Sequence, residues 1–182
     1  MRVIAGEARG LPLHSPAPGV RPTMDRVREA IFSSLGEEVP EARVLDLFAG
    51  SGAMGIEALS RGAALAIFVD ADPRCAECVR ENLRRARLRA SVQVMDALKF
   101  LELYAEEGFD LIFADPPYKK SPAGRDFASD LLRLPSLVRA LRSHGKFVLE
   151  RAAGSKDPEG GLLSLVRLRR YGRSEIAYYV PA

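Results

Sequence analysis

The sequence predicts an α/β fold with a doubly wound, mostly parallel sheet of seven strands, and three observations carry this prediction. Between residues 43 and 150, five short apolar runs alternate with segments of helical periodicity. A glycine-rich loop joins the first run directly to the helical segment that follows it. Finally, the runs at 164–171 and 175–180 are separated by Gly172-Arg173-Ser174, which is typical of a closing hairpin with one antiparallel strand.

The segment before the sheet predicts a small extension rather than a second domain. We expect residues 1–22 to form this extension, with a β-hairpin at 2–14 followed by a linker rich in Pro and Ser. The main domain is expected over residues 23–182, and it begins with a helix at about 24–35 whose apolar residues form one stripe. The five central strands are expected at Arg43–Phe48, Leu65–Asp70, Ser91–Met95, Leu111–Ala114 and Lys146–Glu150.

Length and composition limit the class of protein. The chain has 182 residues, of which 47% are hydrophobic, and this suits a single domain that buries roughly 70% of its unfolded surface. It has no apolar run long enough to cross a membrane, and Met1-Arg2-Val3 leads directly into the first expected strand. We therefore expect a cytoplasmic protein without a secretory leader, and a monomer by default.

The glycine loop after the first central strand is a candidate ligand site. Gly50, Gly52 and Gly55 spell G-x-G-x-x-G, the dinucleotide fingerprint, so a nicotinamide or flavin enzyme has to be considered. Asp46 lies just ahead of the loop, where its carboxylate would repel a pyrophosphate. A ligand with ammonium and sulfonium groups fits such a carboxylate better.

Two further acids end the next two strands. Asp70 can accept hydrogen bonds from both hydroxyls of a ribose, which is also expected in a nicotinamide site. Asp96 can lie opposite the amino group of an adenine. Its other expected role is to cap the helix that begins at Ala97, and one carboxylate can serve both roles.

The most informative motif is Asp115-Pro116-Pro117-Tyr118, which follows the apolar strand Leu111–Ala114. Ligands of open α/β sheets bind outside the carboxyl ends of strands, which is where this tetrapeptide falls. The exocyclic amine of a nucleobase is a poor nucleophile, and acceptors at its N–H groups favour the geometry that frees its lone pair. Asp115 and the Pro116 carbonyl can supply these acceptors, and Tyr118 can stack on the base. The alternative is a proline turn that only ends a strand.

Cys75 and Cys78 form a C-x-x-C pair that has to be weighed as a metal or redox site. The sequence has no second cysteine pair, and His14 and His144 stand far from this one in the chain. Because a structural zinc ion needs four ligands, we expect no metal site. The two thiols are expected to be reduced and partly buried.

Net charge is only +3, but its distribution points toward a nucleic acid. The excess lies near the N-terminus, where a basic hairpin and helix can contact phosphates without reading sequence. The candidate RNA-binding residues are Arg2, Arg9, Arg21, Arg26 and Arg28. A second basic group, Arg80, Arg84, Arg85, Arg87 and Arg89, is expected on the helix after Asp70. We interpret it as an exposed face ion-paired to Glu77 and Glu81.

The motifs together resemble a class I S-adenosylmethionine-dependent methyltransferase, which has a Rossmann-like fold. Arg2-Val-Ile-Ala-Gly6, Arg9-Gly10 and above all the segment Arg21-Pro-Thr-Met-Asp-Arg-Val-Arg-Glu-Ala-Ile-Phe32 resemble the bacterial RsmD family. Members of that family methylate the N2 amine of one guanine in small-subunit (16S) ribosomal RNA. The resemblance covers essentially the whole chain.

The resemblance implies S-adenosyl-L-methionine as cofactor and ribosomal RNA as partner, either naked or within a partly assembled small subunit. It implies that residues 115–118 line the target-base site and that Arg21-Pro22-Thr23 packs beside both sites. The cofactor-binding residues it implies are Asp46, Phe48, Ala49, Gly50, Ser51, Gly52, Asp70, Ala71, Asp96, Ala97 and Thr23. In the proposed mechanism, the sulfonium methyl passes in line to guanine N2.

Three alternatives stay open at this point. An adenine-N6 DNA methyltransferase shares both motifs, but this chain has little room for a domain that reads duplex sequence. A glutamine-N5 protein methyltransferase would also act on a poorly nucleophilic nitrogen, because the lone pair of a planar amide is delocalised. The N-terminal arginines argue against this alternative. A non-catalytic RNA-binding protein would need to lose Asp115 or the glycine loop, and both are intact.

Overall fold

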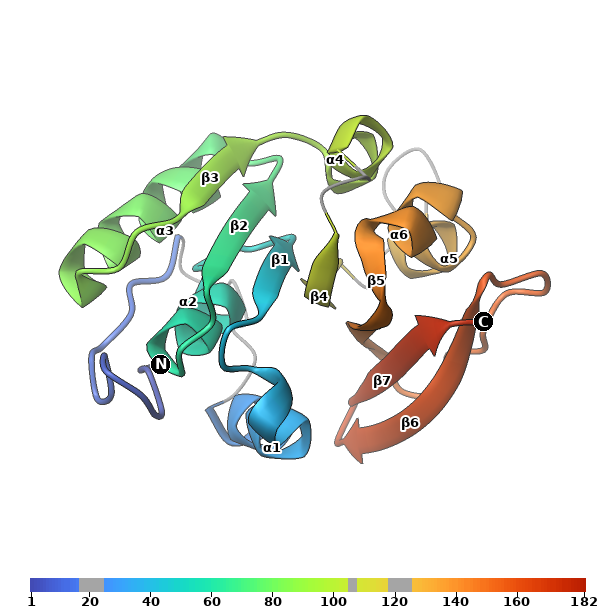
Figure 1. Cartoon of the computed structure of the whole chain (residues 1–182), viewed down its shortest axis with the longest axis horizontal. Coiled ribbons are helices and arrows are strands. Elements are labelled where there is room, and N and C mark those ends of the chain that lie inside the picture. The colour runs from blue at the N-terminus through green and yellow to red at the C-terminus, as the bar shows by residue number, and fades with distance from the viewer. Residues whose placement is uncertain (17–24, 105–107, 118–125) are drawn as a thin grey trace. The chain divides into compact units, whose positions relative to one another are not determined.

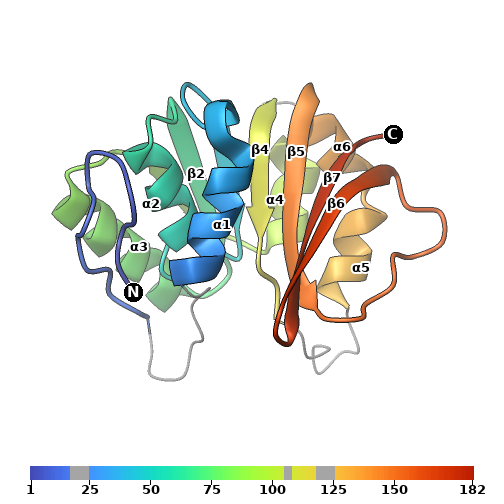
Figure 2. The same cartoon turned by 90° about the horizontal axis from the view of Figure 1, so that it is seen from below.

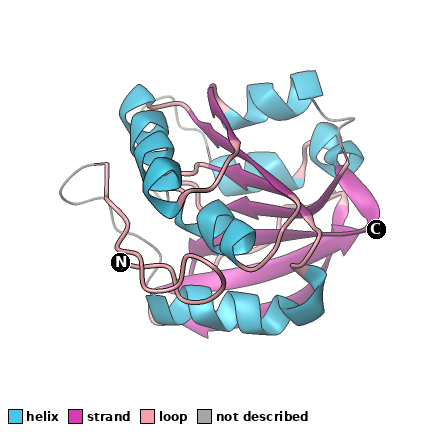
Figure 3. Cartoon of the chain, turned by 60° about the vertical axis from the view of Figure 1, so that its left-hand side comes forward, coloured by secondary structure: helices cyan, strands magenta, loops and turns pink. Residues whose placement is uncertain are grey.

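The computed structural model describes residues 1–16, 25–104, 108–117 and 126–182. It divides the chain into two compact units, Met1–Ala97 and Leu98–Ala182, each of which is described by itself. Figure 1 labels the helices and strands, and Figure 3 shows the same chain coloured by secondary structure. None of the described helices is long and apolar enough to cross a membrane.

The first unit contains three parallel strands in the order β3-β2-β1. Their bounds are β1 Arg43–Leu47, β2 Leu65–Asp70 and β3 Ser91–Val94. The helical elements are α1 Asp25–Leu35, the 3-10 helix η1 Gly36–Glu38, α2 Ala53–Ser60 and α3 Pro73–Ala86. Helix α4, Ala97–Tyr104, begins at the boundary between the units.

Apolar strands form the core of the first unit. Val44, Leu45 and Leu47 of β1 are fully buried, as is Phe68 of β2. Because a parallel strand has helices against it, its sequence is a near-continuous apolar run rather than an alternating one. Asp46 therefore stands out as the one charged residue within β1 that is buried.

The leading segment folds back on itself but does not form the two strands expected at 2–14. One antiparallel bridge joins Arg2 to Pro12, and the Val3 N–H donates to the Leu11 carbonyl at 2.9 Å. Both turns need a left-handed backbone, at Gly6 (φ 79°) and Gly10 (φ 84°). The expected boundary at residue 22 lies outside the described part of the chain.

Helix α2 holds this leading segment in place. The Ile4 and Ala5 N–H groups donate to the Glu57 carboxylate at 2.8 and 3.0 Å, and the Ala8 N–H donates to the Ser60 hydroxyl at 2.9 Å. These bonds satisfy backbone groups that would otherwise need water. The segment is therefore docked on the first unit rather than loosely attached.

The second unit contains four strands in the order β4-β5-β7-β6, joined with the helices α5 Phe127–Leu132 and α6 Pro135–Ala140. The strands are β4 Phe109–Ala114, β5 Leu141–Ala152, β6 Leu163–Tyr171 and β7 Ser174–Pro181. Strands β4 and β5 are parallel, and only β7 runs in the opposite direction. Figure 2 shows this unit from below.

The predicted fold class is confirmed, including seven strands of which one is antiparallel. Several element boundaries differ from the prediction, most of them by one or two residues; β4, for example, begins at Phe109 rather than Leu111. Strand β5 begins at Leu141 rather than Lys146. Leu141 pairs with Phe109 of β4, the exposed Arg142, Ser143 and His144 interrupt both the apolar pattern and the regular register, and pairing resumes between Lys146 and Leu111. Helix α2 begins at Ala53, directly after Gly52, so Gly55, the last glycine of the motif, lies within the helix.

Candidate functional site

The loop after β1 is a tight turn with left-handed residues at Phe48 (φ 56°), Gly50 (φ 55°) and Gly52 (φ 76°). The three motif glycines have different reasons to lack a side chain. A Cβ on Gly52 would meet the Val79 side chain at 3.1 Å, and one on Gly55 would meet the Phe68 ring at 2.4 Å. A Cβ on Gly50 would meet only the Phe48 carbonyl, at 3.9 Å. Gly52 and Gly55 are therefore needed for packing, whereas the space beside Gly50 can admit a ligand.

Asp46 is almost completely buried, with 3% of its surface exposed. One of its carboxylate oxygens accepts a hydrogen bond from the Gly55 N–H at 2.9 Å. Burial raises the pKa of the Asp46 carboxyl to about 7, the negative charge of Asp70 adds to the increase, and the Gly55 N–H opposes it. Near neutral pH this acid can therefore gain or lose a proton in response to a nearby charge.

Asp70 ends β2 with both carboxylate oxygens anchored by backbone N–H groups. Gly50 N donates to Oδ2 at 2.8 Å, and Asp72 N donates to Oδ1 at 2.9 Å. Each carboxylate oxygen can accept a second hydrogen bond, so the anchored group can still bind hydroxyls. The first of these bonds also fixes the glycine loop to the end of β2.

Asp96 and Ala97 follow β3, beside the end of β2. The Met95 N–H donates to the Asp70 carbonyl at 3.0 Å, which brings these two chain segments together. Asp96 is half-buried and Ala97 is buried. Ala97 is the first residue of α4, as expected, whereas capping by the Asp96 side chain stays a prediction.

Ten of the eleven predicted cofactor residues lie in the first unit, and Thr23 lies outside the described residues. Sequence reasoning missed Asn82, a fully buried residue of α3 that supports the loop. Its amide N–H group donates to the Ser51 carbonyl at 2.9 Å and to the His14 carbonyl at 3.0 Å, and its oxygen accepts from the His14 N–H. An amide side chain between Val79 and Leu83, on the apolar side of the helix, was the available signal.

The proposed amine clamp begins directly at the carboxyl end of β4 in the second unit. Phe113 and Ala114 are buried, Asp115 is half-buried, Pro116 is buried and Pro117 is exposed. Strand β4 ends at Ala114, and the two prolines that follow have no N–H group with which to continue its hydrogen bonding. Tyr118 lies outside the described residues.

The predicted RNA-binding arginines do not share one environment. Arg2, Arg9 and Arg26 are exposed, and Arg21 lies outside the described residues. Arg28 is fully buried: its guanidinium pairs with Asp25 at 3.0 Å and with Glu57 at 3.6 Å. It also donates to the Arg2 carbonyl. The expectation that Arg28 contacts RNA is therefore corrected, because its guanidinium joins α1 to α2 and the leading segment.

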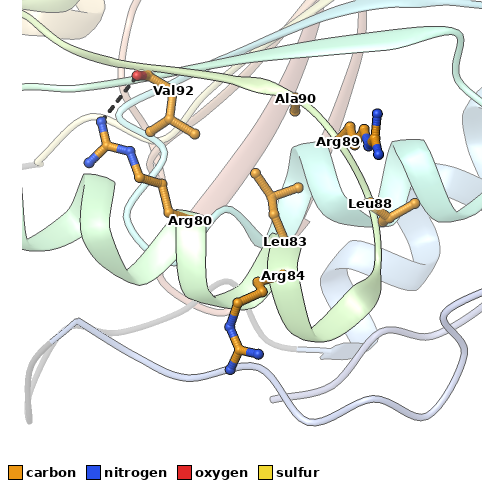
Figure 4. A pocket seen from close by; sticks show the side chains of 7 residues that line it. All are labelled: Arg80, Leu83, Arg84, Leu88, Arg89, Ala90 and Val92. Carbon is orange, nitrogen blue, oxygen red and sulfur yellow. Dashed lines mark hydrogen bonds between the residues drawn. The ribbon is translucent and has the colours of Figure 1, made fainter.

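The second basic group is arranged largely as expected. Arg80 pairs with Glu77 at 3.5 Å and Arg84 with Glu81 at 2.8 Å, both on exposed surface. Helix α3 ends at Ala86, so Arg87 and Arg89 lie beyond it rather than on it. A shallow surface hollow of about 370 Å³ lies between this part of α3 and β3 (Figure 4), lined by Arg80, Leu83, Arg84, Leu88, Arg89, Ala90 and Val92. None of its lining residues belongs to the predicted cofactor set.

Cys75 and Cys78 are free and half-buried, as expected. Burial, together with the negative charges of Asp70 and Asp72, raises the pKa of the Cys75 thiol to about 12. Burial also raises the pKa of the Cys78 thiol. Both groups stay protonated at neutral pH, so they are weak nucleophiles. In the part of the chain that the structure describes, no group of three His, Cys, Asp or Glu residues is arranged to hold a metal ion.

Several known proteins similar to this chain are named as methyltransferases. The chain is 40% identical over 185 residues to a Bacillus subtilis protein named "Putative rRNA methyltransferase YlbH", with 98% of each chain covered. It is 41% identical to the Escherichia coli protein "Ribosomal RNA small subunit methyltransferase D" over 66% of this chain and 61% of that one. A solved structure titled "Putative methyltransferase" from Escherichia coli matches with a TM-score of 0.77 and 31% identity, covering 100% of this chain and 97% of that one.

The match to a family model extends over residues 1–180, nearly the whole chain, and includes the glycine loop and Asp115-Pro116-Pro117-Tyr118. The similarity to YlbH covers the same extent. These findings confirm the predicted resemblance to the RsmD family. The chain belongs to the family described as "Conserved hypothetical protein 95", the RsmD family.

Proposed function

We propose that this protein is an S-adenosylmethionine-dependent methyltransferase that modifies the N2 amine of a guanine in small-subunit ribosomal RNA. The observation that carries the proposal is the half-buried Asp115 beside buried Pro116 at the carboxyl end of β4. The names of the relatives support the wider activity, ribosomal RNA methylation, and the motif supports an amine as the acceptor. Such a substrate implies action in the cytoplasm.

Residues of the first unit fit S-adenosylmethionine in charge and in space. Asp46 has a pKa of about 7, so a nearby ammonium or sulfonium group would favour its ionised form. The anchored Asp70 would accept the ribose hydroxyls, and open space beside Gly50 lets a ligand approach the backbone. When bound, the cofactor supplies a methyl group that its positive sulfur has already activated.

In the proposed mechanism, the clamp orients the acceptor and does not act as a strong base. The Asp115 carboxylate and the Pro116 carbonyl accept the two N–H groups of the guanine amine, and Tyr118 stacks on the base. Holding the nitrogen in line with the methyl group can lower the barrier by about 7 to 11 kcal/mol. Asp115 then accepts the proton that the methylated nitrogen releases, and it passes that proton to water.

Methyl transfer to different acceptors provides the direct test. The protein is incubated with labelled S-adenosylmethionine and ribosomal RNA, small ribosomal subunits, DNA or protein, and each product is digested. We expect label in N2-methylguanosine. Label confined to N6-methyladenine or to methylglutamine would reject the guanine proposal in favour of a DNA or protein acceptor.

Replacing Asp115 separates the clamp from the cofactor site. We expect Asp115→Ala to lower kcat by a factor of about 100 or more, because one of two acceptors on the reacting amine is lost. Affinity for S-adenosylmethionine should stay within twofold of the wild type, measured by calorimetry. Asp110→Ala is the matched control, since Asp110 lies on the same strand and pairs at 3.0 Å with the exposed Arg142. Equal activity of the two variants would contradict the clamp assignment.

A further inference from the structure

Strand β6 carries a cluster of arginines outside the site described above. Arg167, Arg169 and Arg170 lie on the strand, Arg173 lies in the turn to β7, and all four residues are exposed. Residues 163–174 contain no acidic residue. This β6 arginine cluster therefore concentrates four positive charges in a chain whose net charge is only +3.

Strand direction places the cluster at the end of the second unit where β4 also ends. Strand β6 runs antiparallel to β7, and β7 runs antiparallel to β5, which is parallel to β4. The carboxyl ends of β4 and β6 therefore lie at the same end of the four strands. The Ala153 N–H, just after β5, donates to the Arg173 carbonyl at 2.9 Å, which ties the turn to this end. Figure 2 shows the β6–β7 turn at the end of these strands where β4 ends.

Register refines this placement. Ala114 pairs with Leu149, Leu149 with Ala177, and Ala177 with Leu168, so one row crosses the four strands. The arginines at 169 and 170 follow Leu168 in the direction in which Asp115 follows Ala114. Three strand spacings of about 4.8 Å separate β4 from β6, or about 14 Å in all. An arginine side chain extends several ångströms from its strand, so the cluster can reach the neighbourhood of a base held at Asp115.

We propose that the β6 arginine cluster binds the phosphate backbone of the RNA strand whose guanine is held by Asp115. This inference rests on the proposed function and adds to it the surface that positions the substrate. Guanidinium groups match phosphate oxygens in geometry and charge, and phosphate contacts fix register without reading sequence. The cluster takes the role that the buried Arg28 cannot fill.

The acid nearest in register does not neutralise the cluster. Glu175 lies opposite Arg170 in the register of β6 and β7, but the Glu175 side chain is buried. One of its oxygens accepts from the Gly154 N–H at 2.9 Å, and the other lies 3.6 Å from the Arg151 guanidinium. The positive charge of Arg170 therefore remains available at the surface.

Protection of an edge strand is the alternative explanation for these arginines, because charge opposes pairing with a second copy. Such protection is needed most along the apolar half of β6, where Leu165 and Val166 are 42% and 54% exposed. That half, Leu163–Val166, carries no charge. The arginines gather instead in the half that lies toward the end of β4, which favours a substrate contact.

The test compares two double variants that each remove two positive charges. Arg169→Gln/Arg170→Gln removes the centre of the cluster. Arg133→Gln/Arg142→Gln is the matched control: both residues are exposed, Arg142 lies near the start of β5, and Arg133 lies next to Leu132, which bonds to Leu162 before β6 begins. Methyl transfer is measured on small ribosomal subunits that lack the modification. Binding of a guanine-containing single-stranded RNA is measured separately at a series of KCl concentrations.

We expect the β6 variant to raise KM for RNA about tenfold with kcat within twofold of the wild type. Its slope of log affinity against log salt should fall by about 2, or about one per lost phosphate contact. The control variant should match the wild type in KM for RNA and in salt slope. A β6 variant with the wild-type salt slope and KM would overturn the inference. So would a wild type that stays monomeric and a β6 variant that dimerises, by sedimentation, because the arginines would then protect an edge strand. RNA binding is measured apart from transfer, so a wild type that methylates no RNA rejects the proposed function while the salt slope still tests the surface.

Discussion

At the scale of single residues, the proton on Asp46 determines the charge that the glycine loop presents. The pKa of this carboxyl is raised from 3.8 to about 7 by burial. Between these values the folded protein holds a proton that the unfolded chain has lost, so stability without ligand should fall as pH rises through this range. A cationic ligand favours the ionised form, so ligand binding should release the proton.

The affinity for S-adenosylmethionine should therefore depend on pH. As pH falls below 7, we expect the Kd to rise by up to tenfold for each pH unit, because Asp46 becomes protonated. Just above pH 7, the Kd should become constant. Asp46→Asn cannot ionise and should show only the titration of the ligand's own amino group. Calorimetry from pH 5.5 to about 7.5 measures the ratio of the wild-type Kd to the Kd of the Asp46→Asn variant. A ratio that stays constant over this range would show that Asp46 does not face the cation.

Arg28 shows what a single buried charge contributes to stability. We expect Arg28→Met to lower the free energy of unfolding by about 3 kcal/mol, because Glu57 is left buried with less compensation. Arg26→Met, two residues away on the exposed face of α1, should change it by less than about 0.5 kcal/mol. Urea denaturation measures both. If the two variants are equally stable, the ion pair does not support the packing of α1.

The predicted and the missed residues differ in how far away in sequence their interaction partners lie. Asp46 and Asp70 could be placed at strand ends because the motif and the strand are adjacent in sequence. The burial of Arg28 could not be predicted, because its partner Glu57 lies on another helix and nothing near Arg28 indicates the pairing. For Asn82, the position between Val79 and Leu83 could indicate burial but not its bond to Ser51, which lies 31 residues away in sequence.

At the scale of elements, the docked leading segment gives a sharp test of close packing. Gly6 and Gly10 both have a left-handed backbone, with φ of 79° and 84°. A Cβ on Gly6 would lie 1.6 Å from the Ser60 carbonyl oxygen, whereas one on Gly10 would meet nothing within 4 Å. Only the first substitution therefore forces the segment away from α2.

We expect Gly10→Ala to lower the free energy of unfolding by about 1 kcal/mol, the cost of the backbone conformation. Gly6→Ala should lower the free energy of unfolding by about 2 kcal/mol more than Gly10→Ala does, because the hydrogen bonds from the Ala8 and Glu7 N–H groups to Ser60 are lost as well. Hydrogen exchange of the Ile4, Ala5 and Ala8 amides should accelerate in the Gly6 variant alone. Equal protection in the two variants would contradict the docking.

Local pattern predicted most elements, and the exceptions have physical causes. Strands β1, β2 and β7 were placed to within about one residue, because continuous apolar runs bounded by turn residues are distinctive. The start of β5 was missed because exposed residues and a shift in the register with β4 separate Leu141 from the apolar run that begins near Lys146. The leading hairpin was overestimated because its glycines favour turns and leave only one bridge.

At the scale of the whole molecule, charge is balanced overall and uneven locally. The 27 basic and 24 acidic residues nearly cancel, yet ion pairs use many of the arginines on α1 and α3. Composition could predict the small net charge but not which arginines remain at the surface, since that depends on the partners each one finds on folding. This is why the N-terminal arginines drew attention in the sequence and the β6 cluster only in the structure.

Ligand-induced stabilisation of the whole chain tests whether cofactor and clamp functions are separable. A ligand that binds only the folded protein stabilises it by about 2.7 kcal/mol at 100 times its Kd, which for a chain of this size raises Tm by roughly 5 to 10 °C. At the same concentration of S-adenosylmethionine, we expect the full shift for the wild type and for Asp115→Ala. Asp46→Asn should show a much smaller one, because its weaker binding leaves the site less saturated. A thermal unfolding scan with and without ligand gives each shift. Loss of the shift in the Asp115 variant would mean that this residue supports cofactor binding, and its effect on methyl transfer would then not identify the acceptor clamp.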